Sequence, residues 1–94
     1  MSSESMQLPQ RTTIDTAQQA LSAATDLGEG ATMVFDASEV EAMDGATTLV
    51  LANIAQTLAG RGTPAAVEKP SAAFVDAFSD LGLFDDLMKM EFRK

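Results

Sequence analysis

The chain has 94 residues, of which 46% are hydrophobic and 21% are charged, and its formal net charge is −8. This length predicts one small domain, and the composition excludes general disorder. Because the chain has no cysteine and no histidine, it cannot form disulfides, thiolate metal sites or a Ser-His-Asp triad, and its acidic charge argues against nucleic-acid binding. That charge either steers the protein toward a basic partner surface or serves solubility alone.

The first residues carry no signal for export or for membrane insertion. Residues 1–10 lack the basic start and the long apolar stretch of a secretory signal, and no later run is long enough for a membrane helix. Together with the missing histidine and cysteine, this predicts a cytoplasmic protein that is not an enzyme and that needs no cofactor or metal ion.

The start of the chain is predicted to be disordered and to lead into an edge strand. Residues 1–5 are polar, so a single domain is expected over residues 6–94. Residues 6–8 can form a short strand that Pro9 ends, and the β-branched residues 12–14 can continue it.

Helical and strand patterns alternate along the rest of the chain. Apolar residues recur at helical spacing in several segments, and short apolar or β-branched runs separate them. The predicted order is helix 17–27, strand 31–35, helix 46–59, strand 65–67, helix 71–81 and a last amphipathic segment over 84–92. Such alternation predicts an α/β domain, with a small, mostly parallel or mixed sheet and helices packed against it.

The same periodicity predicts which side chains face the core and which residues cap the helices. Asp15 or Thr16 is expected to cap the first helix. The predicted core includes Leu21, Leu49, Ile54, Leu58, Phe74, Phe78, Leu81 and Met88, whereas Met90 is predicted to face solvent.

Residues 34–51 contain the candidate functional turn, where a strand loop meets a helix. Free N–H groups and the positive end of the helix dipole favour an anion there. Asp44 is therefore either an N-cap or an acid that contacts a partner. Thr47 and Thr48 lie in the first helical turn, where a phosphate would be favourable, or they are only local caps.

The carboxylates around this loop are also candidates for a Mg²⁺ site. Asp36, Glu39, Glu41 and Asp44 are close in sequence, and the α/β pattern is that of response-regulator receivers. The acidic pair and the strand-end lysine of receivers are missing. Lys69, which precedes a proline, resembles only weakly the Lys-Pro of a receiver. No metal site is predicted.

Four segments, in this order and spacing, resemble the STAS domain of bacterial anti-sigma factor antagonists. They are IDTAQQAL (14–21), MVFDASEVEAMD (33–44), LAGRGTPAAVEKPS (58–71) and FSDLGLFDDL (78–87). The resemblance runs from about Leu8 to Leu87. STAS domains usually begin with a two-stranded hairpin, which residues 1–13 are too few to form. In this the chain is similar to stand-alone members found beside chemotaxis kinases or lipid-transport ABC components.

A second difference from the family lies in the turn before the long helix. Family members read Asp-Ser-Ser-Gly or Asp-Thr-Ala-Gly there, and a kinase phosphorylates the residue after the aspartate. This chain reads Asp44-Gly45-Ala46-Thr47, so the phospho-switch position is Gly45, which has no hydroxyl. Gly45 is either a lost acceptor or a residue needed for an unusual backbone angle. The expected regulatory or docking residues are Ser38, Asp44, Ala46, Thr47 and Thr48.

The resemblance implies a non-enzymatic regulatory module of bacterial signalling and transcription that binds a protein partner through residues 38–48 and the exposed face of the following helix. The partner would be an anti-sigma serine kinase or a chemotaxis-type histidine kinase. The alternative is a structural STAS subunit of a phospholipid-transport ABC system, with an ABC ATPase as partner. A phospho-receiver or enzyme is the least favoured hypothesis.

Overall fold

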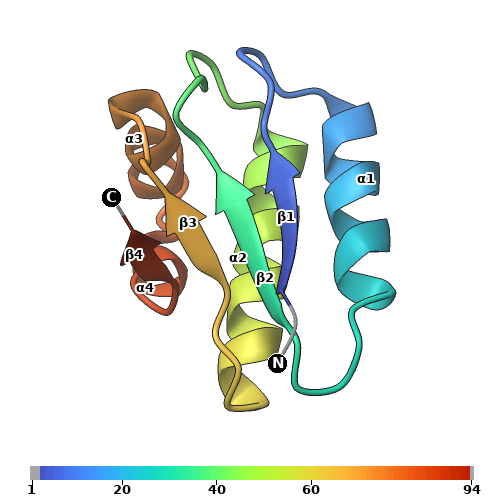
Figure 1. The fold of residues 1–94 in the computed structure, drawn as a ribbon. Helices are drawn as coiled ribbons and strands as arrows, with labels where there is room; N and C mark the ends of the chain where they lie inside the picture. The colour runs from blue at the N-terminus through green and yellow to red at the C-terminus, as the bar shows by residue number, and fades with distance from the viewer. Residues whose placement is uncertain (1–2, 94) are drawn as a thin grey trace.

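The computed structural model describes residues 3–93, which form four strands and four helices (Figure 1). In chain order the elements are β1 Ser3–Gln7, α1 Ile14–Thr25, β2 Thr32–Asp36, α2 Gly45–Gly60, β3 Ala66–Glu68, α3 Ala72–Asp80, α4 Phe84–Leu87 and β4 Glu91–Arg93. None of these helices has the length and apolar character that a membrane crossing requires.

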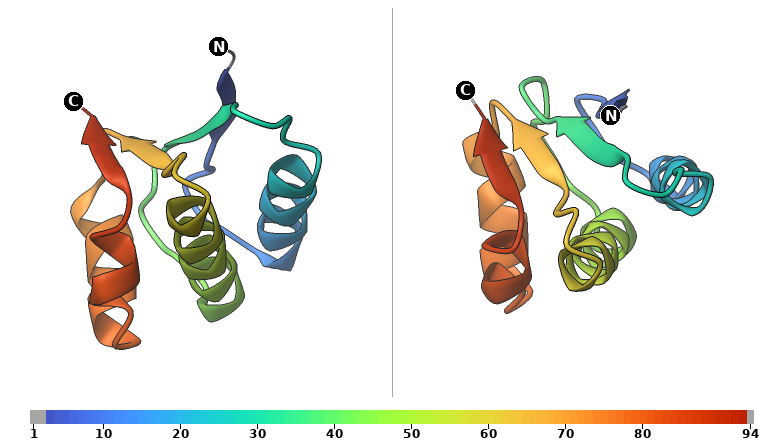
Figure 2. Two further views of the ribbon diagram at one scale, coloured as in Figure 1. Left: turned by 90° about the horizontal axis from the view of Figure 1, so that it is seen from below. Right: turned by 60° about the horizontal axis from the view of Figure 1, so that its bottom comes forward.

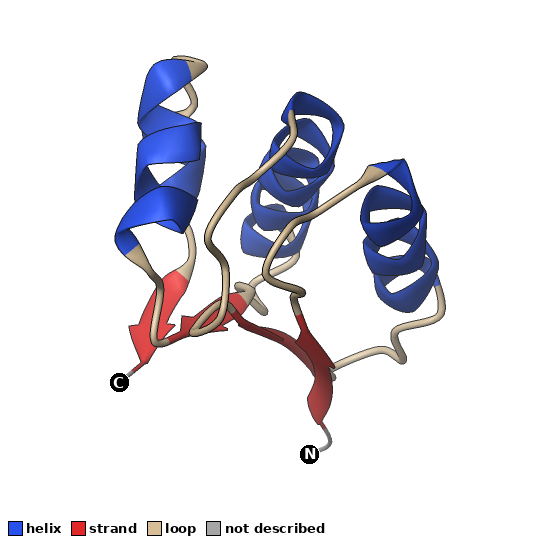
Figure 3. Cartoon of the chain, turned by 90° about the horizontal axis from the view of Figure 1, so that it is seen from above, coloured by secondary structure: helices blue, strands red, loops and turns tan. Residues whose placement is uncertain are grey.

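The strands form one parallel sheet whose spatial order, β1-β2-β3-β4, is the same as their order in the chain. Each crossover therefore steps to the next strand in the same direction. Because such crossovers share one hand, all helices fall on the same face of the sheet. Figures 2 and 3 show this two-layer arrangement, with the strands in one layer and the helices in the other. The predicted α/β class, with helices packed against a mostly parallel sheet, is confirmed.

Side chains alternate between the two faces of the sheet. Phe35 and Val67 are paired in register and are both fully buried in the core beneath the helices. Their neighbours Val34 and Ala66 point to the opposite face, since successive strand residues alternate sides. The helices add Phe74 and further apolar side chains to the core, so one layer of helices completes a single hydrophobic centre.

The start of the chain differs from the prediction. Residues 3–5 form the first part of β1 and pair with β2, so the expectation of disorder is wrong for them, and residues 1 and 2 lie outside the described part. Residues 12–14 do not continue the strand, because α1 already begins at Ile14. Thr13 is the N-cap of that helix, in place of the predicted Asp15 or Thr16, and its N–H donates to Thr16 Oγ1 at 3.1 Å.

The end of the chain differs as well. The last segment leaves helical geometry after Leu87 and forms the strand β4, which pairs with β3. This change of period reverses two predictions, because Met90 is buried and Met88 is about half exposed. Three further leucines that the periodicity placed in the core are also about half exposed, namely Leu21, Leu49 and Leu81.

Candidate functional site

The candidate turn is held by a second loop at the same end of the sheet. The loop after β1 and the loop after β2 run side by side and exchange backbone hydrogen bonds. Gln10 O accepts from Glu41 N at 2.8 Å and from Ala42 N at 3.0 Å, and Thr12 N donates to Ala42 O at 3.1 Å. The start of α2 is therefore fixed by residues about thirty positions earlier in the chain.

Asp44 is the N-cap of α2 and is bonded through both carboxylate oxygens. Its Oδ2 accepts from Thr47 N at 3.2 Å, and its Oδ1 accepts from the Thr12 hydroxyl at 2.6 Å. The same Thr12 oxygen accepts from Asp44 N at 2.9 Å. The capping role that the sequence offered for Asp44 is confirmed, while contact with a partner remains a prediction.

The pKa of Asp44 reflects the balance between its burial and these bonds. Burial alone raises the pKa of a carboxyl group, because it disfavours the charged form. The hydrogen bonds from Thr12 and Thr47 favour the charged form more strongly, so the pKa of Asp44 lies below its ordinary value of 3.8. Asp44 is thus held as a carboxylate that stabilises the fold at neutral pH.

Thr47 and Thr48 are both fully buried. The Thr47 hydroxyl donates to Thr13 O at 3.0 Å, and the Thr48 hydroxyl donates to Asp44 O at 2.9 Å. Neither oxygen can reach a kinase without opening the first turn of α2. Of the two hypotheses for these threonines, the geometry favours local structural bonds.

Gly45 is exposed and begins α2. Its backbone is not in the left-handed region, and a Cβ added there would meet no other heavy atom within 4 Å. The explanation that Gly45 is needed for an unusual backbone angle is therefore wrong. The position can accept a side chain, although this sequence places none there, and the next residue, Ala46, is half-buried beside it.

Ser38 lies in the same loop but belongs to a separate turn. Its hydroxyl and its N–H both donate to Asp36 Oδ1, at 2.7 Å and 2.9 Å, and these bonds lower the pKa of Asp36. Ser38 is exposed, so it is the one hydroxyl among the five expected docking residues that is open to solvent. The loop also contacts β1 through a hydrogen bond from Gln7 to Glu39.

The exposed face of the helix that follows the turn, predicted above to take part in partner binding, is the outer face of α2. None of the 16 residues of α2 is charged, although the chain carries 20 Asp, Glu, Lys and Arg residues in all. The helix exposes Gly45, Leu49, Asn53, Gln56, Thr57 and Gly60, and Leu49 is 53% exposed. A surface helix normally presents charged or polar residues to solvent. We call these six residues the α2 outer face.

The sheet offers no obvious cofactor crevice. In open parallel sheets, ligands bind where the strand order reverses and neighbouring crossovers diverge. The order β1-β2-β3-β4 contains no such reversal. Within residues 3–93, no three carboxylate side chains gather as metal ligands either, and the sequence cluster from Asp36 to Asp44 is divided between the Ser38 turn and the Asp44 cap.

Comparison of the chain with family models, with curated proteins and with solved structures found no match. The site therefore rests on its own geometry. That geometry includes two residues that the sequence analysis placed in a strand, Thr12 and Thr13, which bond to Asp44 and Thr47 across 32 and 34 positions. Their β-branched character indicated a strand, whereas a threonine pair ahead of an apolar periodic run is also typical of a helix cap.

Proposed function

We propose that this chain is a non-enzymatic, STAS-type regulatory module that binds a protein partner through the α2 outer face and the exposed loop before it. Its place would be the bacterial cytoplasm, and its partner a serine kinase or histidine kinase of a signalling pathway. The observation that carries the proposal is the uncharged α2 outer face with the exposed Leu49 one turn after its start. Charged residues are depleted at the centre of protein interfaces, and exposed apolar side chains supply their binding energy.

Three further features support docking over catalysis. The chain has no histidine or cysteine. The polar side chains of the turn before α2 are engaged in local hydrogen bonds, and the strand order contains no reversal that would form a ligand crevice. The acidic charge of the chain favours a partner whose surface is basic around an apolar centre.

A second function is favoured by one observation. Gly45 cannot be phosphorylated, and the hydroxyls of Thr47 and Thr48 are buried. A docking module without a phospho-switch in this turn suits a structural STAS subunit of a phospholipid-transport ABC system, whose partner would be the ABC ATPase.

Site-specific photocrosslinking in the native cell tests the proposal and separates its two versions. A photoreactive phenylalanine analogue at Leu49 is expected to give one major crosslinked product, which mass spectrometry identifies. The control positions are Gln19 on α1 and Glu91 on β4, both exposed and outside the α2 outer face. A kinase supports the signalling version, and an ABC ATPase supports the transport version. Crosslinks at the control positions but none at Leu49 would refute the docking surface.

A further inference from the structure

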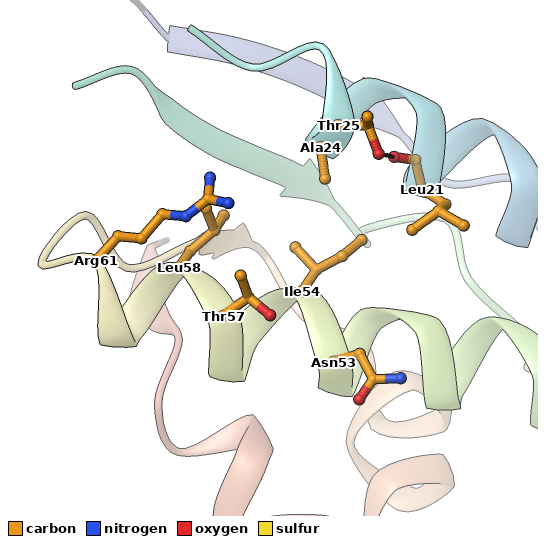
Figure 4. Close-up of a pocket in the computed structure, with 8 residues that line it drawn as sticks. All are labelled: Leu21, Ala24, Thr25, Asn53, Ile54, Thr57, Leu58 and Arg61. Carbon is orange, nitrogen blue, oxygen red and sulfur yellow. Dashed lines mark hydrogen bonds between the residues drawn. The ribbon is translucent and has the colours of Figure 1, made fainter. Parts of the chain in front are cut away.

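A groove between α1 and α2 lies beside the α2 outer face. It is a hollow of about 150 Å³, open to solvent, whose wall on α1 is formed by Leu21, Ala24 and Thr25 (Figure 4). The opposite side is lined by Asn53, Ile54, Thr57 and Leu58 of α2 and by Arg61, the C-cap of that helix. The floor is apolar and buried, whereas Leu21 at its edge is 53% exposed. Leu49 lies one turn before Asn53 on α2 and is not part of this lining.

The size of this groove indicates what it can hold. Pockets that enclose a small molecule measure roughly 300–1,000 Å³ and cover most of the ligand. A hollow of about 150 Å³ takes one ring or one aliphatic side chain. Because it is open, and because Leu21 at its edge is about half exposed, the rest of the occupant would lie across the helices. A single side chain presented by a larger partner fits these conditions.

Charge specifies the occupant further. Arg61 is the only charged side chain that lines the groove, and it makes no ion pair with the residues that the structure describes. Arg61 also borders an adjoining hollow, where Glu29 lies on the loop after α1 but not within ion-pair distance. A guanidinium presents several donors in a fixed plane and binds carboxylates in a bidentate manner. The end of the groove is thus complementary to an acid, although the chain as a whole is acidic.

Two helices packed side by side form a furrow that suits a third helix, whose side chains fit between theirs. Arg61, the C-cap of α2, follows Ile54 by seven residues, which corresponds to about 10 Å along the helix axis. We propose that the α1–α2 groove binds an amphipathic helix of the partner protein, which inserts one apolar side chain between Leu21 and Ile54. An acidic residue one to two helical turns away then binds Arg61. This inference rests on the proposed docking function and names the element that the partner supplies.

Selection from a displayed library of helical peptides tests the assignment with the full chain as the target. Peptides selected by the wild-type chain are expected to share an apolar anchor and an acidic residue at a fixed offset of three, four or seven positions. The same selection on Arg61→Glu is expected to replace that acid by Lys or Arg. An Arg61→Gln chain should lose the acid preference without gaining a basic one. The matched control is Arg11→Glu, which changes the charge equally outside the groove.

The affinity of the selected peptides and the location of their binding site then decide the result. The best wild-type peptide is expected to bind Arg61→Glu at least tenfold more weakly than Arg11→Glu. Its amide shift changes should centre on Ala24, Asn53 and Thr57. Selected peptides that show no acid preference, or that bind both arginine variants equally, would overturn the proposal.

Hexanoate, a small carboxylate with an apolar tail, is the probe for a different occupant. If hexanoate saturates the groove while no selected peptide shifts its amides, the groove is a small-ligand site and the proposal is wrong. The two proposals can fail separately. A crosslinked partner at Leu49 without acid dependence leaves the docking function intact and rejects the helix assignment. Peptides that bind the groove when no partner is crosslinked at Leu49 would support the helix assignment and reject the docking function.

Discussion

The first turn of α2 and the α2 outer face differ in how their polar groups are bonded. At its first turn, Asp44, Thr47 and Thr48 direct every side-chain oxygen into bonds with nearby backbone or with Thr12. Along its outer face the same helix exposes Leu49 and carries no charge. The polar side chains of the first turn are thus bonded within the molecule, while Leu49 on the outer face is exposed to solvent.

This contrast shows how structural and binding roles can be separated within one helix. Buried polar groups stabilise a fold only when they are paired, and in the described part of the chain no buried side-chain oxygen or nitrogen lacks a partner. The exposed Leu49 takes no part in such pairing, and its apolar surface gains free energy only when something covers it. Substitutions in the first turn of α2 should therefore change the stability of the fold, whereas substitutions on the α2 outer face should change partner binding.

Loss of the cap is expected to give the largest change. Asp44→Ala removes the acceptor for Thr47 N and leaves the buried Thr12 hydroxyl without its partner, so the free energy of unfolding should fall by about 1–3 kcal/mol. Urea denaturation measures the loss. The control is Asp76→Ala at an exposed position of α3, where a change within about 0.5 kcal/mol is expected. Equal effects at both positions would show that the network does not stabilise the fold.

A charge on the outer face should affect binding and leave the fold intact. Leu49→Glu places a carboxylate at the centre of the proposed interface, and affinity for the crosslinked partner should fall about tenfold or more. The free energy of unfolding should change by less than about 0.5 kcal/mol, because Leu49 is exposed. Calorimetric titration and urea denaturation provide the two measurements, with Gln19→Glu as the charge-matched control. A stability loss without a binding loss would remove Leu49 from the interface.

The pH dependence of stability separates the cap from the rest of the fold. Because the folded-state pKa of Asp44 is depressed, its stabilisation is present above the unfolded-state pKa near 3.8 and is lost as the pH falls through the lower folded value. Thr12→Val removes one of the bonds that lower this pKa. The variant should lose about 1 kcal/mol at neutral pH and less at the acid end. Ser38→Ala isolates the similar contribution of Asp36, and parallel curves for wild type and Thr12→Val would contradict this account.

The smallest effect is expected at the first residue of α2. Gly45→Ser and Gly45→Ala add a side chain in open space at a helical position. Each should therefore raise the free energy of unfolding by about 0.5 kcal/mol or less. Thermal unfolding measures the change. A destabilisation above about 1 kcal/mol would restore a conformational role for the glycine. With the serine in place, incubation with the crosslinked kinase would also show whether this turn can be phosphorylated at all.

The alternation of strands and helices was predictable because each element carries its own local pattern. The run from Thr32 to Phe35 is apolar on both faces, as a parallel strand is, and Asp44 and Ser71 precede periodic segments as caps do. The outer face of α2 was not predictable in the same way. Because this helix is apolar nearly all round, its pattern has no clear phase, and the prediction that Leu49 lies in the core was wrong.

Long-range pairing explains the remaining differences. Nothing local marks residues 91–93 as a strand, and they become one by pairing with β3. This pairing also decides that Met90 is buried and Met88 is not. The bond between Thr12 and Asp44 joins positions 32 apart and likewise has no signal in either segment. Local patterns therefore predicted which element comes next, and tertiary contacts decided how the candidate turn is closed.

The strand order also affects how the chain can assemble during its synthesis. Because β1, β2, β3 and β4 lie side by side in the order in which the ribosome releases them, each new strand has its only earlier partner already in place. No strand has to be inserted between two that are already paired. The nascent chain can thus extend its sheet at one edge as each helix emerges, and β4, the last of these strands to appear, adds to that edge beside β3.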